Sequence, residues 1–208
     1  MLRARRLLVT SGLVDELPEI DGLRERWGHD VVHCPYCHGW EFREQAIGVL
    51  ATGPMSVHQA LLFRQLSADV TFFTHTAGDV SVEQLTDLGI AVVDGEVAGL
   101  EVSEDRISGV RLRDGRVVPR SAVVVATRMV ARAGFLEDLG LRPVEHPSGA
   151  GEHLVADPTG RTEVPGVWAA GNVVELSAQV GASAAAGAMA GAQINADLVM
   201  AGIVGWRG

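Results

Sequence analysis

Two cysteines form the cluster whose residue types are best suited to chemistry. Cys34 and Cys37 are the only cysteines in the 208 residues, and His33 and His38 flank them. A C-x-x-C spacing brings two sulfur atoms close enough to form a disulfide within one tight turn. If a helix begins at the second cysteine, its unpaired N–H groups and its dipole favour a thiolate on the first. The thiolate is the attacking species in thiol–disulfide exchange, so this arrangement indicates redox chemistry.

The cysteine spacing leaves four interpretations open. The first is a redox-active dithiol. The second is attachment of a c-type haem, because Cys34-x-x-Cys37-His38 spells that motif, but such attachment requires export and no export signal is visible. The third is half of a zinc site with His33 or His38, although no second C-x-x-C is present. The fourth is a buried pair that packs as small hydrophobic residues, which leaves the spacing unexplained.

Composition and charge limit the classes of protein to which the chain can belong. Hydrophobic residues make up 47% of the chain and charged residues 21%, which predicts a folded core rather than disorder. The net charge is −9, and this argues against nucleic acid or an anionic membrane as a partner. No stretch reaches the roughly 18 apolar residues of a membrane span, and the apolar run after the basic residues 1–6 is too short for a signal peptide. We therefore expect a cytoplasmic protein of one large or two small domains.

The residues around and after the cysteines alternate between strand and helix patterns. A buried strand at 47–53 ends in glycine, a helix follows at 56–66, and another strand comes at 69–74. This spacing is typical of a right-handed parallel crossover. Further expected elements are a helix at 82–88, a strand at 90–93, an antiparallel meander over 97–118 and a strand at 122–126. Trp40 and Phe42 are predicted to pack beside the cysteine turn.

The two ends of the chain carry shorter patterns. The expected elements are a strand at 7–10 that leads to Gly12, short helices at 23–27 and 135–139, and strands at 153–156 and 167–172. Almost every residue from 179 to 200 is small, which predicts a helix that can approach a sheet or a ligand closely. The N–H groups of its first turn would be directed at that ligand.

The C-terminal sequence resembles a known flavin-binding motif. Thr162 and the run V-P-G-V-W-A-A-G-N at 164–172 are similar to T-x-x-P-G-[VI]-[FY]-A-A-G-D, the second FAD motif of the thioredoxin reductase superfamily. Together with the C-x-x-C upstream, the resemblance covers about residues 5–198. The run C-P-Y-C-H-G at 34–39 looks most like the dithiol oxidase branch of gliotoxin and holomycin type, whose members oxidise small dithiols with FAD and oxygen.

The resemblance implies an α/β fold with two dinucleotide-binding-like domains of the three-layer Rossmann type. Residues 31–127 would form an NAD(P)H-binding-like domain that carries the C-x-x-C. Residues 1–30 would be a remnant of an FAD-binding domain, and residues 128–208 would be its C-terminal part. The FAD domain would then be incomplete at its N-terminus, as in a fragment, an alternative start or a truncated paralogue.

The resemblance also assigns roles to individual residues. Cys34 and Cys37 would exchange electrons with a dithiol or disulfide, and Cys37 would lie against the flavin. His38 stands where reductases of this type carry an acid, and it would move a proton to or from a thiol near neutrality. The flavin-binding residues would be Gly12, Gly171, Asn172, Gln179 and Val180.

The implied function is that of a flavin-dependent thiol–disulfide oxidoreductase of thioredoxin reductase type, leaning to a dithiol oxidase that uses oxygen. Its partner would be a small dithiol or disulfide, or a thioredoxin-like protein, and relatives of this type are usually homodimers. The alternative is a truncated, cofactor-free relative that serves as a non-catalytic binding module. The C-x-x-C and the C-terminal flavin motif favour the enzyme, and the missing ADP-binding half favours the module.

Three departures from the family pattern concern the cofactors. No G-x-G-x-x-G, which would hold the ADP part of FAD, occurs in these 208 residues, so the isolated chain is expected to bind FAD weakly or not at all. The second dinucleotide turn reads A-T-G-P-M-S at 51–56 and no basic cluster follows the strand at 69–74, which predicts poor use of NADPH. Asn172 replaces the usual Asp and keeps one acceptor oxygen for a ribityl hydroxyl.

Overall fold

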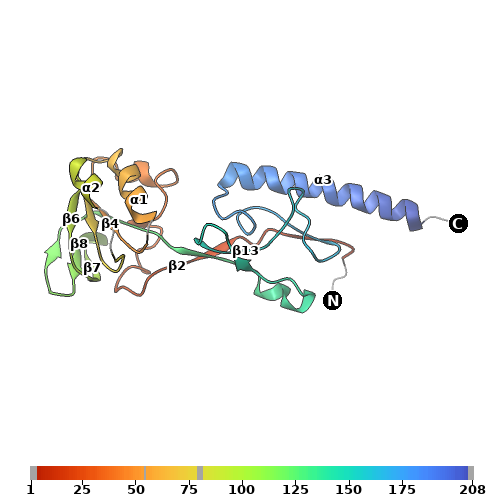
Figure 1. Cartoon of the computed structure of the whole chain (residues 1–208), viewed down its shortest axis with the longest axis horizontal. Coiled ribbons are helices and arrows are strands. Elements are labelled where there is room, and N and C mark those ends of the chain that lie inside the picture. The colour runs from red at the N-terminus through yellow and green to blue at the C-terminus, as the bar shows by residue number, and fades with distance from the viewer. Residues whose placement is uncertain (1–3, 54, 79–81, 206–208) are drawn as a thin grey trace. The chain divides into compact units, whose positions relative to one another are not determined.

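The computed structural model describes residues 4–53, 55–78 and 82–205. The chain divides into two compact units, which Figure 1 draws as ribbons. Unit 1 combines the two ends of the sequence, Met1–Glu16 and Arg128–Gly208, and unit 2 is the continuous stretch Leu17–Thr127. Unit 2 is therefore inserted into the sequence of unit 1.

Unit 2 is built on a parallel sheet of five strands in the order β3-β10-β4-β5-β6. These strands are β3 (Val31–Val32), β10 (Ala122–Val125), β4 (Ile47–Leu50), β5 (Val70–Phe73) and β6 (Ala91–Val93). Each of the four pairings is parallel. The strands β10, β4 and β5 are buried on both faces, which explains why their sequences are continuous apolar runs.

Two further layers cover this sheet (Figure 1). They contain the helices α1 (Met55–Arg64) and α2 (Glu83–Asp87), and an antiparallel sheet of β7 (Val97–Ser103), β8 (Arg106–Leu112) and β9 (Val117–Val118). Phe63 and Leu85 of the helices share one core with Val49. Leu100 of β7 shares a second core with Leu50. Adjacent residues of β4 thus enter opposite cores, as the two-residue period of a strand requires, and the predicted three-layer α/β fold is confirmed.

Residues 17–30 belong to unit 2, whereas the sequence placed residues 1–30 with the flavin-binding part. Leu23 is fully buried in the core beneath β7 and β8. The buried carboxylate of Asp30 accepts hydrogen bonds from the guanidinium of Arg26 and from a backbone N–H of β8. These long-range contacts are invisible in a local sequence pattern, and they fix the segment to the three-layer unit.

The short helix expected at 23–27 is wrong, because the backbone there forms separate turns. The N–H of Leu23 bonds to the carbonyl of Ile20, and the N–H of Trp27 bonds to the carbonyl of Arg24. A stretch of five residues is too short to stabilise a helix by itself, so tertiary contacts decide its conformation. The other short helix, expected at 135–139, is a 3₁₀ helix, η2 (Gly134–Leu139).

Unit 1 contains two small sheets. The strands expected at both ends of the chain are present as β1 (Leu7–Val9) and β14 (Val167–Ala169), and they pair in parallel. A mixed sheet has the order β12-β13-β11-β2, with β12 (Val144–Glu145), β13 (Gly151–His153), β11 (Arg128–Ala131) and β2 (Leu13–Glu16). β2, β11 and β12 were not expected, because their short sequences mix charged and apolar residues.

The helix α3 (Val180–Gly205) is fastened to the β1–β14 pair by one charged cluster. Asp197 on α3 accepts hydrogen bonds from Arg6, at 2.5 Å, and from Arg161, at 3.2 Å. The guanidinium of Arg161 also lies 4.7 Å from the ring centroid of Trp168 in β14. Trp168 and Ala190 of α3 are buried together in a small core.

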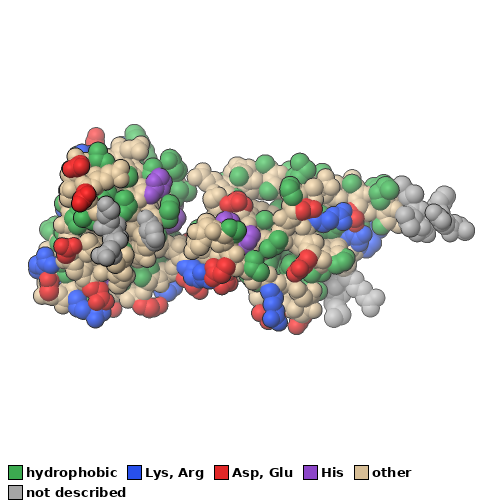
Figure 2. All heavy atoms as spheres, viewed as in Figure 1, with side chains coloured by type: hydrophobic (Ala, Val, Ile, Leu, Met, Phe, Trp, Pro, Cys, Tyr) green, Lys and Arg blue, Asp and Glu red, His purple; other side chains and the backbone are tan. Residues whose placement is uncertain are grey.

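Most of α3 is exposed to solvent. Among its described side chains only Ala190 is buried, and the large exposed ones are Val180, Met189, Val199 and Met200. In Figure 2 hydrophobic side chains are scattered along this helix. Within the described residues, no helix combines the length and the apolar character needed to cross a membrane.

Candidate functional site

The two cysteines lie in a helical turn that follows β3 in unit 2. The N–H groups of Cys37 and His38 bond to the carbonyl of Cys34 at 3.3 and 3.2 Å, and the N–H of Gly39 bonds to that of Pro35 at 3.0 Å. The chain continues directly into a 3₁₀ helix, η1 (Gly39–Phe42). The helix expected after the second cysteine is thus only the short 3₁₀ helix η1. The turn just before it contains both cysteines.

Gly39 allows this turn to lie directly on α1. A Cβ atom at Gly39 would be 2.6 Å from Cδ1 of Leu66 and 3.5 Å from the ring of Phe63. Of the two aromatic residues predicted to pack beside the cysteine turn, Phe42 is buried in the same core and Trp40 is exposed. The reason is geometric, because Gly39 and Phe42 occupy the inner face of η1 and Trp40 falls on its outer face.

The two thiols are accessible and interact with each other. Cys34 is half-buried and Cys37 is exposed, which contradicts the interpretation of a buried hydrophobic pair. A side-chain hydrogen bond to Cys34, helped by partial burial, raises the pKa of the Cys37 thiol to about 11. Cys37 therefore keeps its proton at neutral pH. Such a thiol pair is the chemical form required for thiol–disulfide exchange.

The two flanking histidines have different surroundings. His38 occupies the N-cap position of η1, is half-exposed, and places its Nδ1 3.5 Å from a carboxylate oxygen of Glu41. His33 ends β3, where its Nδ1 lies 3.1 Å from the carbonyl oxygen of Val125 and its own carbonyl accepts a 3.0 Å hydrogen bond from Gln59. His38 is therefore accessible to solvent, and His33 anchors the cysteine turn to the sheet. Among the residues that the structure describes, no three His, Cys, Asp or Glu side chains are grouped to hold a metal.

The Gly171 turn of unit 1 brings together the residues assigned to flavin binding. Gly171 follows β14 with a φ of 87°, a conformation that glycine adopts without strain, and its carbonyl accepts the N–H groups of Val174 and Glu175. A Cβ atom at Gly12 would lie 3.4 Å from Oδ1 of Asn172. One at Gly171 would lie 3.6 Å from Cβ of Ser183 in the first turn of α3.

The start of α3 is open at this turn. Gln179 immediately precedes the helix, and its carbonyl accepts the N–H of Ser183 at 2.9 Å. Val180 is the first helical residue and is exposed. Asn172 is half-buried, and its amide has no hydrogen-bond partner among the described residues. The free amide and the open helix start are suited to a ligand that carries hydroxyl groups and a polar ring edge.

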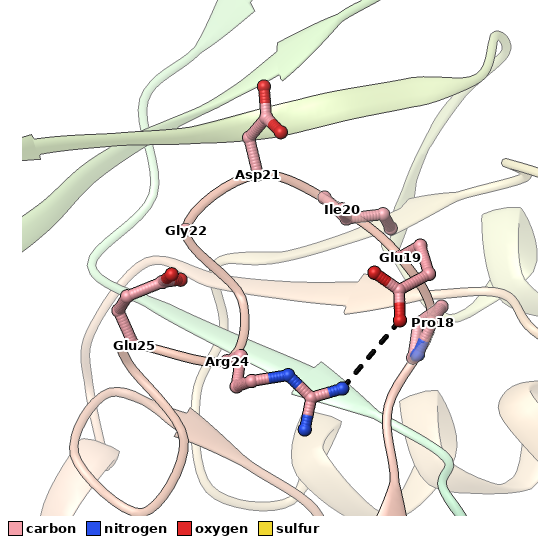
Figure 3. A pocket seen from close by; sticks show the side chains of 7 residues that line it. All are labelled: Pro18, Glu19, Ile20, Asp21, Gly22, Arg24 and Glu25. Atoms are coloured by element: carbon pink, nitrogen blue, oxygen red, sulfur yellow. Dashed lines mark ion pairs between the residues drawn. The ribbon is translucent and has the colours of Figure 1, made fainter.

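Each unit also has a hollow that the sequence did not predict. In unit 1 a cavity of about 270 Å³ is lined by Ala182 and Ala186 of α3, by Ala178 just before that helix and by Gly171, but not by Asn172 or Gln179. In unit 2 a hollow of about 470 Å³ lies over residues 18–25. Figure 3 shows Glu19 and Arg24 facing each other across it, in an ion pair of 3.7 Å. Neither hollow contains a cysteine or histidine side chain.

Two backbone N–H groups in the turn between β4 and α1 are hydrogen-bonded to a side chain of the same segment. The hydroxyl of Ser56 accepts the N–H groups of Thr52 and Gly53 at 3.1 and 3.3 Å. In a dinucleotide-binding turn such N–H groups point at the pyrophosphate. Sequence reasoning noted the glycine of this turn but missed the role of Ser56, although a serine at the start of a helix is a recognised capping signal.

Comparison with known proteins gives a consistent result. Residues 1–192 match the family described as Pyridine nucleotide-disulphide oxidoreductase. Thioredoxin reductase tcpT of Claviceps purpurea is 31% identical, over 93% of this chain and 64% of the relative. Thioredoxin reductase sirT of Leptosphaeria maculans is 27% identical, over 92% of this chain and 62% of the relative. The resemblance to thioredoxin reductases inferred from the sequence is therefore confirmed.

Solved structures agree with these relatives. The crystal structure of HlmI superposes with a TM-score of 0.85 at 43% identity, covering 96% of this chain and 62% of that one. An oxidoreductase from Agrobacterium tumefaciens gives a TM-score of 0.82 at 34% identity, covering 94% and 65%. The chain thus spans slightly less than two thirds of the length of these relatives. Because the family match runs through both the cysteine turn and the Gly171 turn, the chain belongs to the pyridine nucleotide-disulphide oxidoreductase family.

Proposed function

We propose that this chain supplies the thiol–disulfide centre and the isoalloxazine end of the flavin site in an FAD-dependent thiol–disulfide oxidoreductase of thioredoxin reductase type. The single observation that carries the proposal is the accessible, interacting pair of Cys34 and Cys37 just after a strand in a Rossmann-type sheet. Two thiols within one tight turn can alternate between dithiol and disulfide.

The cysteine turn supports a definite division of roles. In this proposal Cys34 exchanges with the substrate sulfur, and Cys37, the second cysteine of the motif, faces the flavin. The raised pKa keeps the proton on Cys37 at neutral pH. His38 beside Glu41 holds or releases the proton that accompanies each thiol–thiolate change.

FAD is the cofactor that the Gly171 turn fits. The free amide of Asn172 offers both a donor and an acceptor to a ribityl chain. Gly12 lies beside this amide, and because it has no side chain it leaves room for the ribityl chain. The first turn of α3, with Gln179 and Val180, offers unpaired N–H groups to the polar edge of a ring system. When bound, FAD supplies the capacity to accept the two electrons of the cysteine pair. Weak retention by the isolated chain is part of this proposal, because its sequence has no G-x-G-x-x-G.

We place the enzyme with the dithiol oxidases rather than with the NADPH-dependent reductases. Two N–H groups of the β4–α1 turn are already bonded to Ser56, so they are unavailable to a pyrophosphate. Burial lowers the pKa of His75, which follows β5 and accepts the N–H of Val97, so the imidazole is neutral at pH 7 and does not attract a 2′-phosphate. Oxygen is then the electron acceptor, and a small dithiol is the substrate. A homodimer in the cytoplasm is the assembly and location that we expect.

The test uses the purified chain with and without added FAD. The two cysteines should titrate as two free thiols after reduction and as none after mild oxidation, and this change should reverse with dithiothreitol. The absorption bands of added FAD should shift when it binds the chain, and the shift should be smaller with the Asn172→Ala variant. A chain that forms no disulfide and does not perturb flavin would instead be a non-catalytic binding module, and a Soret band would indicate haem.

A further inference from the structure

A glutamine buried behind the cysteine turn has no part in the chemistry described above. Gln59 lies in the middle of α1 and is only 7% exposed, so its amide is removed from water. Its Nε2 donates a 3.0 Å hydrogen bond to the carbonyl of His33, the residue just before Cys34. Its Oε1 is buried and has no hydrogen-bond partner among the described residues. A buried amide with one unpaired polar atom is uncommon and requires an explanation.

The bond to His33 fixes the orientation of this amide. A backbone carbonyl only accepts hydrogen bonds, so the amide of Gln59 must turn its NH₂ group toward it. The oxygen on the other side of the amide then carries a desolvation cost that a methionine of similar length would not have. The hydrogen bond to the carbonyl of His33 is therefore what the amide contributes at this position.

The ring of His33 holds the same backbone from a second side. Its Nδ1 lies 3.1 Å from the carbonyl oxygen of Val125 at the end of β10, so this nitrogen carries a proton. The Nε2 of Gln59 lies 3.5 Å from the same ring nitrogen, but both groups are donors and this contact adds no hydrogen bond. With its ring on the sheet and its carbonyl on α1, His33 fixes the backbone that leads into Cys34.

The helix α1 also holds the other end of the cysteine turn. Gly39 packs against it so closely that a Cβ atom there would lie 3.5 Å from the ring of Phe63. Gln59 and Phe63 are four residues apart and lie on the same face of α1. One face of this helix thus contacts the turn twice, at His33 through a hydrogen bond and at Gly39 through packing. The two cysteines lie between these two fixed points.

We propose that Gln59 is a positioning residue of the cysteine pair, which holds the carbonyl of His33 so that Cys34 stays beside Cys37 in the dithiol form and disulfide closure is favoured. This inference rests on the proposed function. The physical reason is conformational entropy. A disulfide bond restrains the turn by itself, whereas two free thiols are kept together by non-covalent contacts such as this one. Loss of the Gln59 bond therefore adds freedom mainly to the dithiol and shifts the equilibrium toward it.

The experiment measures this equilibrium on the full chain without flavin, in buffers of graded glutathione ratio. The cysteine disulfide takes two electrons and two protons from two glutathione thiols, which become glutathione disulfide. Alkylation traps the free thiols, and mass spectrometry counts them. Gln59→Met removes the donor at similar side-chain length and should shift the equilibrium constant toward the dithiol about three-fold or more. Gln65→Met is the matched control, because Gln65 is exposed just beyond α1 and should leave the constant unchanged.

Unfolding and hydrogen exchange separate positioning from a general structural role. Gln59→Met leaves the carbonyl of His33 without its donor, but it also removes the unpaired oxygen. These two effects oppose each other, so the unfolding midpoint of the reduced chain should change little. A second measurement needs no variant. In the unmodified dithiol, the side-chain N–H groups of Gln59 should exchange with solvent about ten-fold more slowly than those of Gln65.

The outcomes separate this inference from the proposed function. If the cysteine pair of the unmodified chain forms no reversible disulfide in any buffer, the proposed function fails. If the disulfide forms but Gln59→Met leaves the constant unchanged or shifts it toward the disulfide, the inference is overturned. An equal shift in Gln65→Met also overturns it. If Gln59→Met does not fold, the exchange rates decide, and side-chain N–H groups of Gln59 that exchange as fast as those of Gln65 overturn the inference.

Discussion

At the scale of single residues, the pairing of the two thiols matters more than the exposure of either one. The hydrogen bond with Cys34 is the largest cause of the raised pKa of Cys37, and partial burial is the second. Because the proton stays on Cys37, the pair presents one thiol and at most one thiolate at neutral pH. This asymmetry lets one sulfur be attacked and the other leave.

The first prediction follows from that cause. Removing the partner in Cys34→Ala should lower the pKa of Cys37 from about 11 toward the ordinary thiol range, so its thiolate fraction at pH 8 should rise. Alkylation of Cys37 by iodoacetamide should then be faster at pH 8 and level off at a lower pH than in the unmodified chain. The profile is measured by mass spectrometry between pH 6 and 11. An unchanged profile would show that Cys34 does not set the pKa.

A second prediction concerns the contact of the cysteine turn with α1. Gly39→Ala places a methyl group 2.6 Å from Cδ1 of Leu66, so the Leu66 side chain must shift, and this overpacking should cost about 1 kcal/mol of unfolding free energy. Gly53→Ala is the control, since a Cβ there meets nothing within 4 Å. Urea unfolding of both variants checks the difference. Equal stability of the two variants would contradict the packing argument.

Residue chemistry was the part of the site that the sequence predicted best. The C-x-x-C spacing, His38 and the pair Gly171-Asn172 are all read directly from the chain, and the structure brings the expected residues together within each unit. Glu41 beside His38 and Arg43 over Trp40 could not be predicted, because both contacts depend on the side-chain directions of a 3₁₀ turn. Their roles in catalysis and cofactor binding stay predictions.

At the scale of elements, the β4–α1 turn stands where the family resemblance implies a dinucleotide-binding turn, and two of its N–H groups are already hydrogen-bonded to Ser56. The hydroxyl of Ser56 accepts the two N–H groups that would otherwise bond to a phosphate. Gly53 is the one glycine of the motif that is present. The third prediction is that calorimetry detects no binding of NADPH that depends on its 2′-phosphate. NADPH and NADH should therefore give indistinguishable titrations, and a clear preference for NADPH would contradict the proposed place among the oxidases.

The segment before β3 supplies the fourth prediction. Asp30→Ala leaves the guanidinium of Arg26 and an N–H of β8 without their buried acceptor, which should cost about 3–5 kcal/mol of unfolding free energy. Asp114→Ala is a matched control, because it removes an exposed carboxylate paired with Arg116 and should leave the unfolding midpoint unchanged. Thermal unfolding by circular dichroism measures both. Similar midpoints for the two variants would refute the assignment of residues 17–30 to unit 2.

The elements divide clearly into those that the sequence predicts and those that it does not. The strands β4, β5 and β10 were predicted because burial on both faces makes them unbroken apolar runs. β2 and β11 were missed because they pair with each other across more than one hundred residues, and their own sequences mix charged and apolar residues. Local pattern thus suffices for a central strand but fails at a strand defined by a distant partner.

At the scale of the whole molecule, the two units differ in how their chain is arranged. Unit 2 is continuous and has a core on each face of its sheet. The fifth prediction is that residues 17–127, produced alone, fold cooperatively and retain a reversible Cys34–Cys37 disulfide. Circular dichroism during heating and thiol titration are the two measurements. A gradual melt without a transition would show that this unit depends on the rest of the chain.

The insertion of unit 2 into unit 1 has a consequence for the order of events on the ribosome. β1 is made first, but its parallel partner β14 is made about 160 residues later. At about 5–20 residues per second, β1 waits roughly ten seconds or longer for that partner. During this interval the whole of unit 2 has been synthesised and can fold before unit 1 is complete. The cysteine pair is therefore exposed to cellular oxidants and thiols before the Gly171 turn exists, and its redox state during synthesis is set by the surroundings rather than by flavin.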